Sequence, residues 1–201
     1  MPFWSRQRLL RGALTPRHAC TIVALASAQA CLAYLAAVLP PVGVDGRLDP
    51  AWLALPAAAI TAGLLTLAAF VDSVCQILPD PLLALAASAA LIYALATGSM
   101  VAALATGGAA AGLAYAVSAL SGMGRGDAKL CGVIGLWLAD PPLTAAALLV
   151  ATGAAGTYAL AMACAGAIGR HSTLALGPWL VGAACLAWYA DVVDIGALLA
   201  G

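Results

Sequence analysis

Long apolar runs, broken at proline, glycine or charged residues, make up most of this chain and decide what it can fold into. A helix needs about 20 mostly apolar residues to cross the roughly 30 Å hydrocarbon core of a bilayer. Seven runs reach or approach that length, at about 19–39, 51–72, 82–98, 101–121, 127–139, 143–168 and 174–190. The third and fifth are short. The sequence therefore predicts an all-α membrane protein, a polytopic bundle of about six or seven transmembrane helices.

The low charge content excludes the soluble alternatives. Only 8% of the residues are charged and 65% are hydrophobic, whereas a soluble domain has about 25% charged residues. So few charges cannot cover a soluble fold, and such an apolar chain is not typical of disorder. The formal net charge of zero also argues against a nucleic-acid partner, because binding phosphates needs a basic surface.

The positions of the basic residues predict an orientation. Cytoplasmic loops of membrane proteins are enriched in Lys and Arg. With a cytoplasmic N-terminus, only Arg47 of the eight basic residues faces outward; the others are Arg6, Arg8, Arg11, Arg17, Arg125, Lys129 and Arg170. We therefore expect a basic cytoplasmic segment over 1–18 and one membrane-embedded domain over 19–201, with 19–39 as a retained signal anchor.

Local signals predict helix starts and close helix packing. Asp80 is expected to cap the helix that follows it, with Pro81 as the first helical residue. Asp140, followed by two prolines, opens a later span. Small residues, as in the pair Gly108 and Gly112, are expected to let helices approach closely.

Two aspartates stand where apolar helices meet the expected cytoplasmic boundary. Asp72 ends one apolar run, and Asp127 begins another after a glycine-rich segment. Each could be an interfacial residue or a helix cap. However, an ionisable group at membrane depth is costly and is a functional candidate, and these two lie on different helices that the fold can bring together. Paired carboxyl groups can activate water with one member and protonate a leaving amine with the other. The pair therefore predicts an aspartic protease without a metal or cofactor.

The expected surroundings of the two carboxyl groups differ. Asp127 lies at a predicted helix N-terminus between Arg125 and Lys129, and both effects favour its ionised form. Asp72 lies at the C-terminal end of its helix in apolar surroundings, which favours the protonated form. We therefore expect Asp127 to act as the base and Asp72 as the acid, within a pair that titrates jointly.

The motifs around these aspartates resemble those of the prepilin leader peptidases, membrane aspartyl proteases of the GxGD type. Residues 72–80, DSVCQILPD, are similar to the family's aspartate, six variable residues and Pro-Asp or Pro-Asn. Residues 124–130, GRGDAKL, are similar to its G-x-G-D-x-K-L, and residues 176–180, LGPWL, match a late G-P-F-L segment more weakly. The three matches occur in the expected order.

The resemblance implies that Asp72 and Asp127 are the catalytic pair and that Gly124, Gly126 and Lys129 support them. It implies a prepilin or pseudopilin substrate with a short basic leader ahead of a hydrophobic helix. The family cuts that leader at the cytoplasmic face of the bacterial inner membrane. Membrane lipid and components of pilus or secretion assembly are the other expected partners.

Some features depart from the larger family members, which carry paired C-x-x-C motifs in a cytoplasmic loop and also methylate the new N-terminus. No C-x-x-C spacing occurs among the six cysteines here, so we expect a peptidase without methyl transfer, as in the compact members of tight-adherence pilus systems. Gln76 stands where Arg or Lys is frequent, which bears on substrate docking. Pro79 and Asp80 are expected to be structural.

Three other functions are compatible with parts of the sequence. A proton- or cation-coupled transporter would use Asp72 and Asp127 near the membrane midplane. A non-catalytic assembly scaffold would tolerate Asp→Asn changes at both positions. A Ser-Lys protease would pair Ser121 or Ser73 with Lys129, which must then be neutral.

Overall fold

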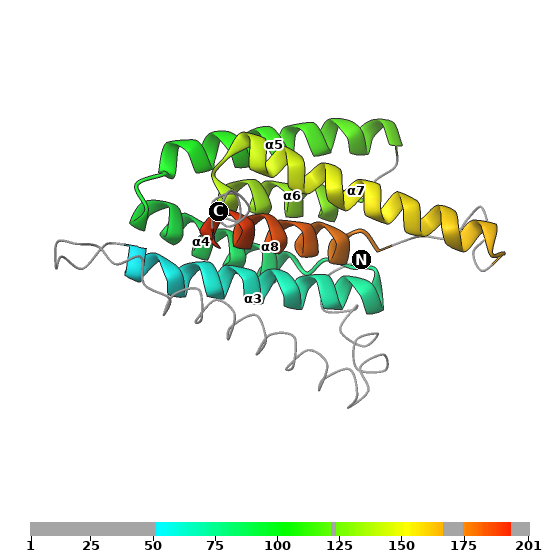
Figure 1. The fold of residues 1–201 in the computed structure, drawn as a ribbon, viewed down its shortest axis with the longest axis horizontal. Coiled ribbons are helices and arrows are strands. Elements are labelled where there is room, and N and C mark those ends of the chain that lie inside the picture. Colours follow the sequence, from blue (N-terminus) through cyan, green and yellow to red (C-terminus); the bar gives the residue numbers. More distant parts are fainter. Residues whose placement is uncertain (1–50, 122–123, 167–174, 194–201) are drawn as a thin grey trace, which may run out of the picture.

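The computed structural model describes residues 51–121, 124–166 and 175–193. These residues form six helices and no strand. The helices are α3 (Ala51–Cys75), α4 (Asp80–Ala96), α5 (Met100–Ser121), α6 (Arg125–Leu138), α7 (Pro141–Cys164) and α8 (Gly177–Val193), arranged as a bundle (Figure 1). The prediction of an all-α bundle is confirmed. The expected anchor over 19–39 and the basic segment over 1–18 lie outside the described residues.

The helix boundaries follow the expected spans, with two informative differences. α3 continues past Asp72 to Cys75, so this aspartate lies in the last turn and not at the end. Asp80 does not cap α4 as expected, because Pro79 takes the N-cap position and Asp80 is the first helical residue. Asp140 does cap α7, since its carboxylate accepts a hydrogen bond of 2.7 Å from the Leu143 N–H.

α6 is the central helix of the described bundle. It packs against α4, α5, α7 and α8, and most of its side chains are buried. Trp137, which is fully buried, stacks on Trp188 of α8 with ring centroids 5.6 Å apart. Because α6 carries Asp127 in its first turn, this carboxyl group stands on the best-packed element of the fold.

Glycines bring the backbones of α5 and α6 into contact. A Cβ atom at Gly135 would lie 2.9 Å from both the Cα of Gly107 and the carbonyl oxygen of Thr106. The expected Gly108 and Gly112 pair does not make this contact, since both residues face open space. The close approach is therefore one residue earlier than predicted, on the face of α5 that carries Gly107.

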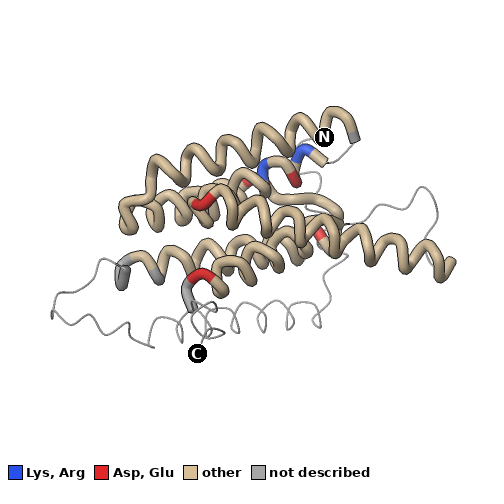
Figure 2. Tube along the Cα trace, turned by 45° about the horizontal axis from the view of Figure 1, so that its top comes forward, with Lys and Arg blue, Asp and Glu red and all other residues tan. Residues whose placement is uncertain are grey.

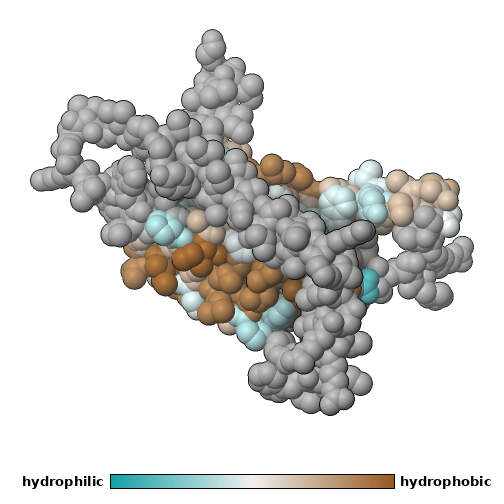
Figure 3. All heavy atoms as spheres, turned by 90° about the horizontal axis from the view of Figure 1, so that it is seen from below, coloured by the Kyte–Doolittle hydropathy of each residue, from teal (hydrophilic) through white to brown (hydrophobic). Residues whose placement is uncertain are grey.

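The outer surface of the bundle is apolar, as contact with lipid requires. Large side chains are exposed there, among them Val101 at 82%, Leu120 at 90% and Leu149 at 72%, and hydrophobic residues dominate the visible described surface in Figure 3. Within the described ranges, three helices are long and apolar enough to cross a membrane, over Pro56–Cys75, Met100–Leu120 and Pro141–Cys164. Charged positions are few along the chain (Figure 2).

We predict that Gly135→Ala destabilises the bundle by about 1–3 kcal/mol, the usual cost of forcing extra volume into a packed interior. Gly108→Ala is the matched control on α5, because its added methyl group meets no atom within 4 Å. The measurement is the unfolding midpoint of each purified variant in detergent. Equal midpoints for the two variants would contradict the backbone contact.

Candidate active site

The two candidate aspartates come together at one end of the bundle. Asp72 lies in the last turn of α3 and Asp127 in the first turn of α6. The segment that follows Asp72 contacts the first turns of α6, through Leu78 against Gly126 and through Asp80 against Lys129. Both lie at helix ends, whereas a transport site would be expected near the middle of the membrane.

Asp72 is buried and held by a residue from the other end of the sequence. Its side chain is only 6% exposed, and its Oδ2 accepts a hydrogen bond of 3.0 Å from the backbone N–H of Gly177. Gly177 is the first residue of α8, where the helix dipole also favours a negative group. A Cβ atom at this position would lie 2.7 Å from the same oxygen. Only a glycine therefore leaves room for this contact.

Gly177 is a functional candidate that the sequence did not assign. The LGPWL segment indicated that residues near 177 matter, but the pattern does not show what they contact. The structure shows that this glycine makes the backbone hydrogen bond to Asp72. The segment 176–180, which matches the family motifs most weakly, therefore contacts Asp72.

The two glycines of the GxGD motif have different neighbours. Gly124 is the N-cap of α6; its backbone is hydrogen-bonded to the carboxyl group of Asp127, and a Cβ atom there would lie 3.1 Å from Oδ2 of that aspartate. Gly126 faces the segment that follows Asp72, because a Cβ atom there would lie 3.1 Å from the Cβ of Leu78. The first glycine thus makes room for the carboxyl group, and the second lets the two motifs touch.

Lys129 connects the same two motifs through an ion pair. Its Nζ lies 2.7 Å from Oδ1 of Asp80, at the start of α4. Both side chains are largely exposed, at 44% and 68%, and such pairs contribute only about 0–1 kcal/mol to stability. The ion pair therefore acts on local geometry, by fixing the start of α4 against the first turns of α6.

This geometry alters the surroundings on which the expected assignment, with Asp127 as the base and Asp72 as the acid, was based. Lys129 pairs with Asp80 and so is not the dedicated partner of Asp127. Asp72 accepts the N–H of Gly177 and so is not in wholly apolar surroundings. Each carboxyl group has one backbone hydrogen bond, so backbone contacts alone do not distinguish the acid from the base. The assignment of Asp127 as the base stays a prediction.

The described residues do not assemble the Ser73–Lys129 pair that a Ser-Lys protease would need. The hydroxyl group of Ser73 donates to the Phe70 carbonyl oxygen at 2.7 Å, and Lys129 forms an ion pair with Asp80. The side chain of Ser121 lies outside the description. Within the described ranges there is also no group of three or more His, Cys, Asp or Glu that could hold a metal ion.

The sequence model of the type IV leader peptidase family matches residues 59–186, which is more than half of the chain and includes both aspartates. The chain belongs to this family. No curated protein and no solved structure matches it. Membership of the type IV leader peptidase family makes the protein a leader-peptidase-like protease, and its apolar helices agree with residence in a membrane.

We predict that Gly177→Ala lowers leader-peptidase activity by roughly 10- to 100-fold, the scale expected for a misplaced catalytic group. The added methyl group collides with the side chain of Asp72, which can rotate away, so the carboxyl group moves while the helices stay packed. Gly153→Ala on α7 is the control, because its methyl group meets open space. Full activity of Gly177→Ala, measured by cleavage of a leader-bearing substrate, would contradict the role of Gly177.

We also predict that Asp80 and Lys129 are energetically coupled by about 0.2–1 kcal/mol, the range for exposed ion pairs. The test is a double-mutant cycle with Asp80→Asn, Lys129→Gln and the double variant. Unfolding is followed in detergent at low and high salt, and the coupling should shrink at high salt because the pair is exposed. A coupling of zero at low salt would contradict the predicted coupling.

Proposed function

We propose that this protein is a prepilin peptidase, an aspartyl endopeptidase of the bacterial inner membrane. In this proposal it removes the short basic leader of a type IV prepilin or pseudopilin at the cytoplasmic face. The observation that carries the proposal is that Asp72 and Asp127 lie at the same end of the bundle, where the segment after Asp72 contacts the first turns of α6. The family match over residues 59–186 supports it independently.

In the proposed mechanism the two carboxyl groups hold one proton between them. The ionised carboxylate takes a proton from a water molecule, whose oxygen bonds to the scissile carbonyl carbon and forms a tetrahedral intermediate. The protonated carboxyl group then gives its proton to the amide nitrogen as the carbon–nitrogen bond breaks. One water is consumed, the leader gains a carboxyl terminus, the mature protein gains an amino terminus, and the pair keeps one proton.

The charge distribution supports the proposed orientation. Arg125 and Lys129, the basic positions of the described residues, lie in the first turns of α6 on either side of Asp127 in the sequence. Basic residues near helix ends favour the cytoplasmic side. A leader that has not crossed the membrane would meet the carboxyl groups on that side.

We further propose that the peptidase acts without N-methyltransferase activity. The support is the absence of any C-x-x-C spacing among the six cysteines of this sequence. Incubation with a leader-bearing substrate and a labelled methyl donor tests this part separately, since transfer of label to the new N-terminus would overturn it.

Asp72→Asn and Asp127→Asn are each expected to lower leader cleavage by more than about 10²-fold, because each removes one partner of the proton transfer. The measurement is the gel shift of a candidate prepilin from the same genome, co-expressed with each variant in membranes. Asp140→Asn is the control, since this exposed aspartate caps α7 and asparagine also caps helices well. All variants must insert to equal levels. Processing that survives either substitution would remove the aspartyl mechanism and favour a scaffold or a transporter.

A further inference from the structure

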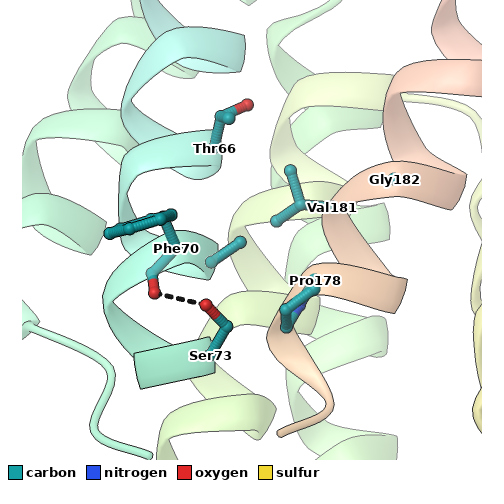
Figure 4. A pocket seen from close by; sticks show the side chains of 7 residues that line it. Thr66, Phe70, Ser73, Pro178, Val181 and Gly182 are labelled. Atoms are coloured by element: carbon teal, nitrogen blue, oxygen red, sulfur yellow. Dashed lines mark hydrogen bonds between the residues drawn. The ribbon is translucent and has the colours of Figure 1, made fainter. Parts of the chain in front are cut away.

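A groove between α3 and α8 begins beside Asp72. Its walls include Thr66, Phe70 and Ser73 from α3 and Pro178, Val181 and Gly182 from α8, and its volume is about 270 Å³. Figure 4 shows Pro178 and Val181 facing α3 across this space. Ser73 follows Asp72 in the chain and Pro178 follows Gly177. One end of the groove therefore lies next to the contact between Asp72 and Gly177 in the candidate active site.

The lining of the groove suits an apolar ligand. Its two hydroxyl groups are used locally: Thr66 donates to the Ala62 carbonyl oxygen at 2.8 Å, and Ser73 to that of Phe70 at 2.7 Å. The other wall residues named above contribute an aromatic ring, a proline ring, an isopropyl group and no side chain; they are Phe70, Pro178, Val181 and Gly182, respectively. Among the described residues, no charged side chain contributes to the lining.

The groove runs from the level of Asp72 into the membrane-spanning part of α3. The stretch from Thr66 to Ser73 covers about 10 Å at 1.5 Å per residue, and it lies inside the apolar span Pro56–Cys75. A polypeptide at that depth must satisfy its own backbone hydrogen bonds, so it has to be helical. A volume of about 270 Å³ is too small to enclose a helix of 10–12 Å diameter. The groove can therefore receive the side chains of one helix face.

We propose that this groove binds the hydrophobic helix of the substrate that follows the scissile bond. One face of that helix packs between α3 and α8, and the residues ahead of it extend past Ser73 to Asp72 and Asp127. The proposal rests on the proposed leader-peptidase function. The position of the groove's end next to the contact between Asp72 and Gly177 selects this occupant, because an apolar segment joined directly to the cleaved bond must lie on a surface near the carboxyl groups.

Gly182 offers a direct test, because a Cβ atom at this position meets no atom of the described residues within 4 Å. The photo-crosslinking amino acid benzoylphenylalanine is placed at position 182 of the full chain, in the Asp127→Asn background so that bound substrate is not released. Irradiation of membranes containing a prepilin should give an adduct that maps to the substrate's hydrophobic segment. The same amino acid at Gly153 of α7, which also faces open space, should give none. Adducts only with lipid, a second copy or the chain's own residues 19–39 would overturn the proposal.

A filling variant gives a second, functional test. Gly182→Leu is expected to lower cleavage of the full-length prepilin at least about tenfold, mainly through a higher KM because binding is lost, while Gly153→Leu does not. Both variants should cleave a short peptide that carries the leader without the hydrophobic segment as the wild type does. Wild-type protein that cleaves neither substrate would refute the proposed function. Unchanged cleavage of the prepilin by Gly182→Leu, with wild type active, would refute the groove alone.

Discussion

A carboxyl group buried among apolar helices must find a hydrogen-bond donor, and one end of this bundle is organised around that requirement for Asp72. An unsatisfied buried polar group costs several kcal/mol. The donor is the N–H of Gly177, which lies 105 residues later in the chain. This contact fixes the position at which α8 begins. It also explains why the first residue of α8 is a glycine. It also places Pro178 beside Ser73, and so defines the groove between α3 and α8.

The other contacts at this end join the two aspartate motifs to each other. The backbone of Gly126 packs against Leu78, and Lys129 pairs with Asp80. Both contacts connect the segment after Asp72 to the first turns of α6. Together with the hydrogen bond from Gly177 to Asp72, these contacts join three segments that are far apart along the chain. They are the end of α3 with the start of α4, the start of α6, and the start of α8.

Much of this architecture can be predicted from the sequence because lipid imposes simple rules. Apolar runs of spanning length identify the helices, and a carboxyl group at the end of such a run identifies Asp72 and Asp127. The role of Gly177 cannot be predicted, because it depends on how α8 is placed along α3. Asp80 was expected to cap α4, but its carboxylate instead reaches Lys129 on another helix. The close contact of α5 was expected at Gly108 and occurs at Gly107, since the rotation of a uniformly apolar helix about its own axis leaves little trace in its sequence.

The glycine contact between α5 and α6 has a consequence for which parts of the fold can move. Where Gly135 meets the backbone of Thr106 and Gly107, there are no flexible side chains to absorb a shift, so α6 is locked in register with its neighbour. α3 and α8 instead face each other across an open groove beside the carboxyl groups. In the proposed complex the guest helix meets only α3 and α8, so it leaves the backbone contact between α5 and α6 untouched. Asp127 therefore stands on the helix that this glycine contact holds, whereas Asp72 stands on a helix that forms one wall of the groove.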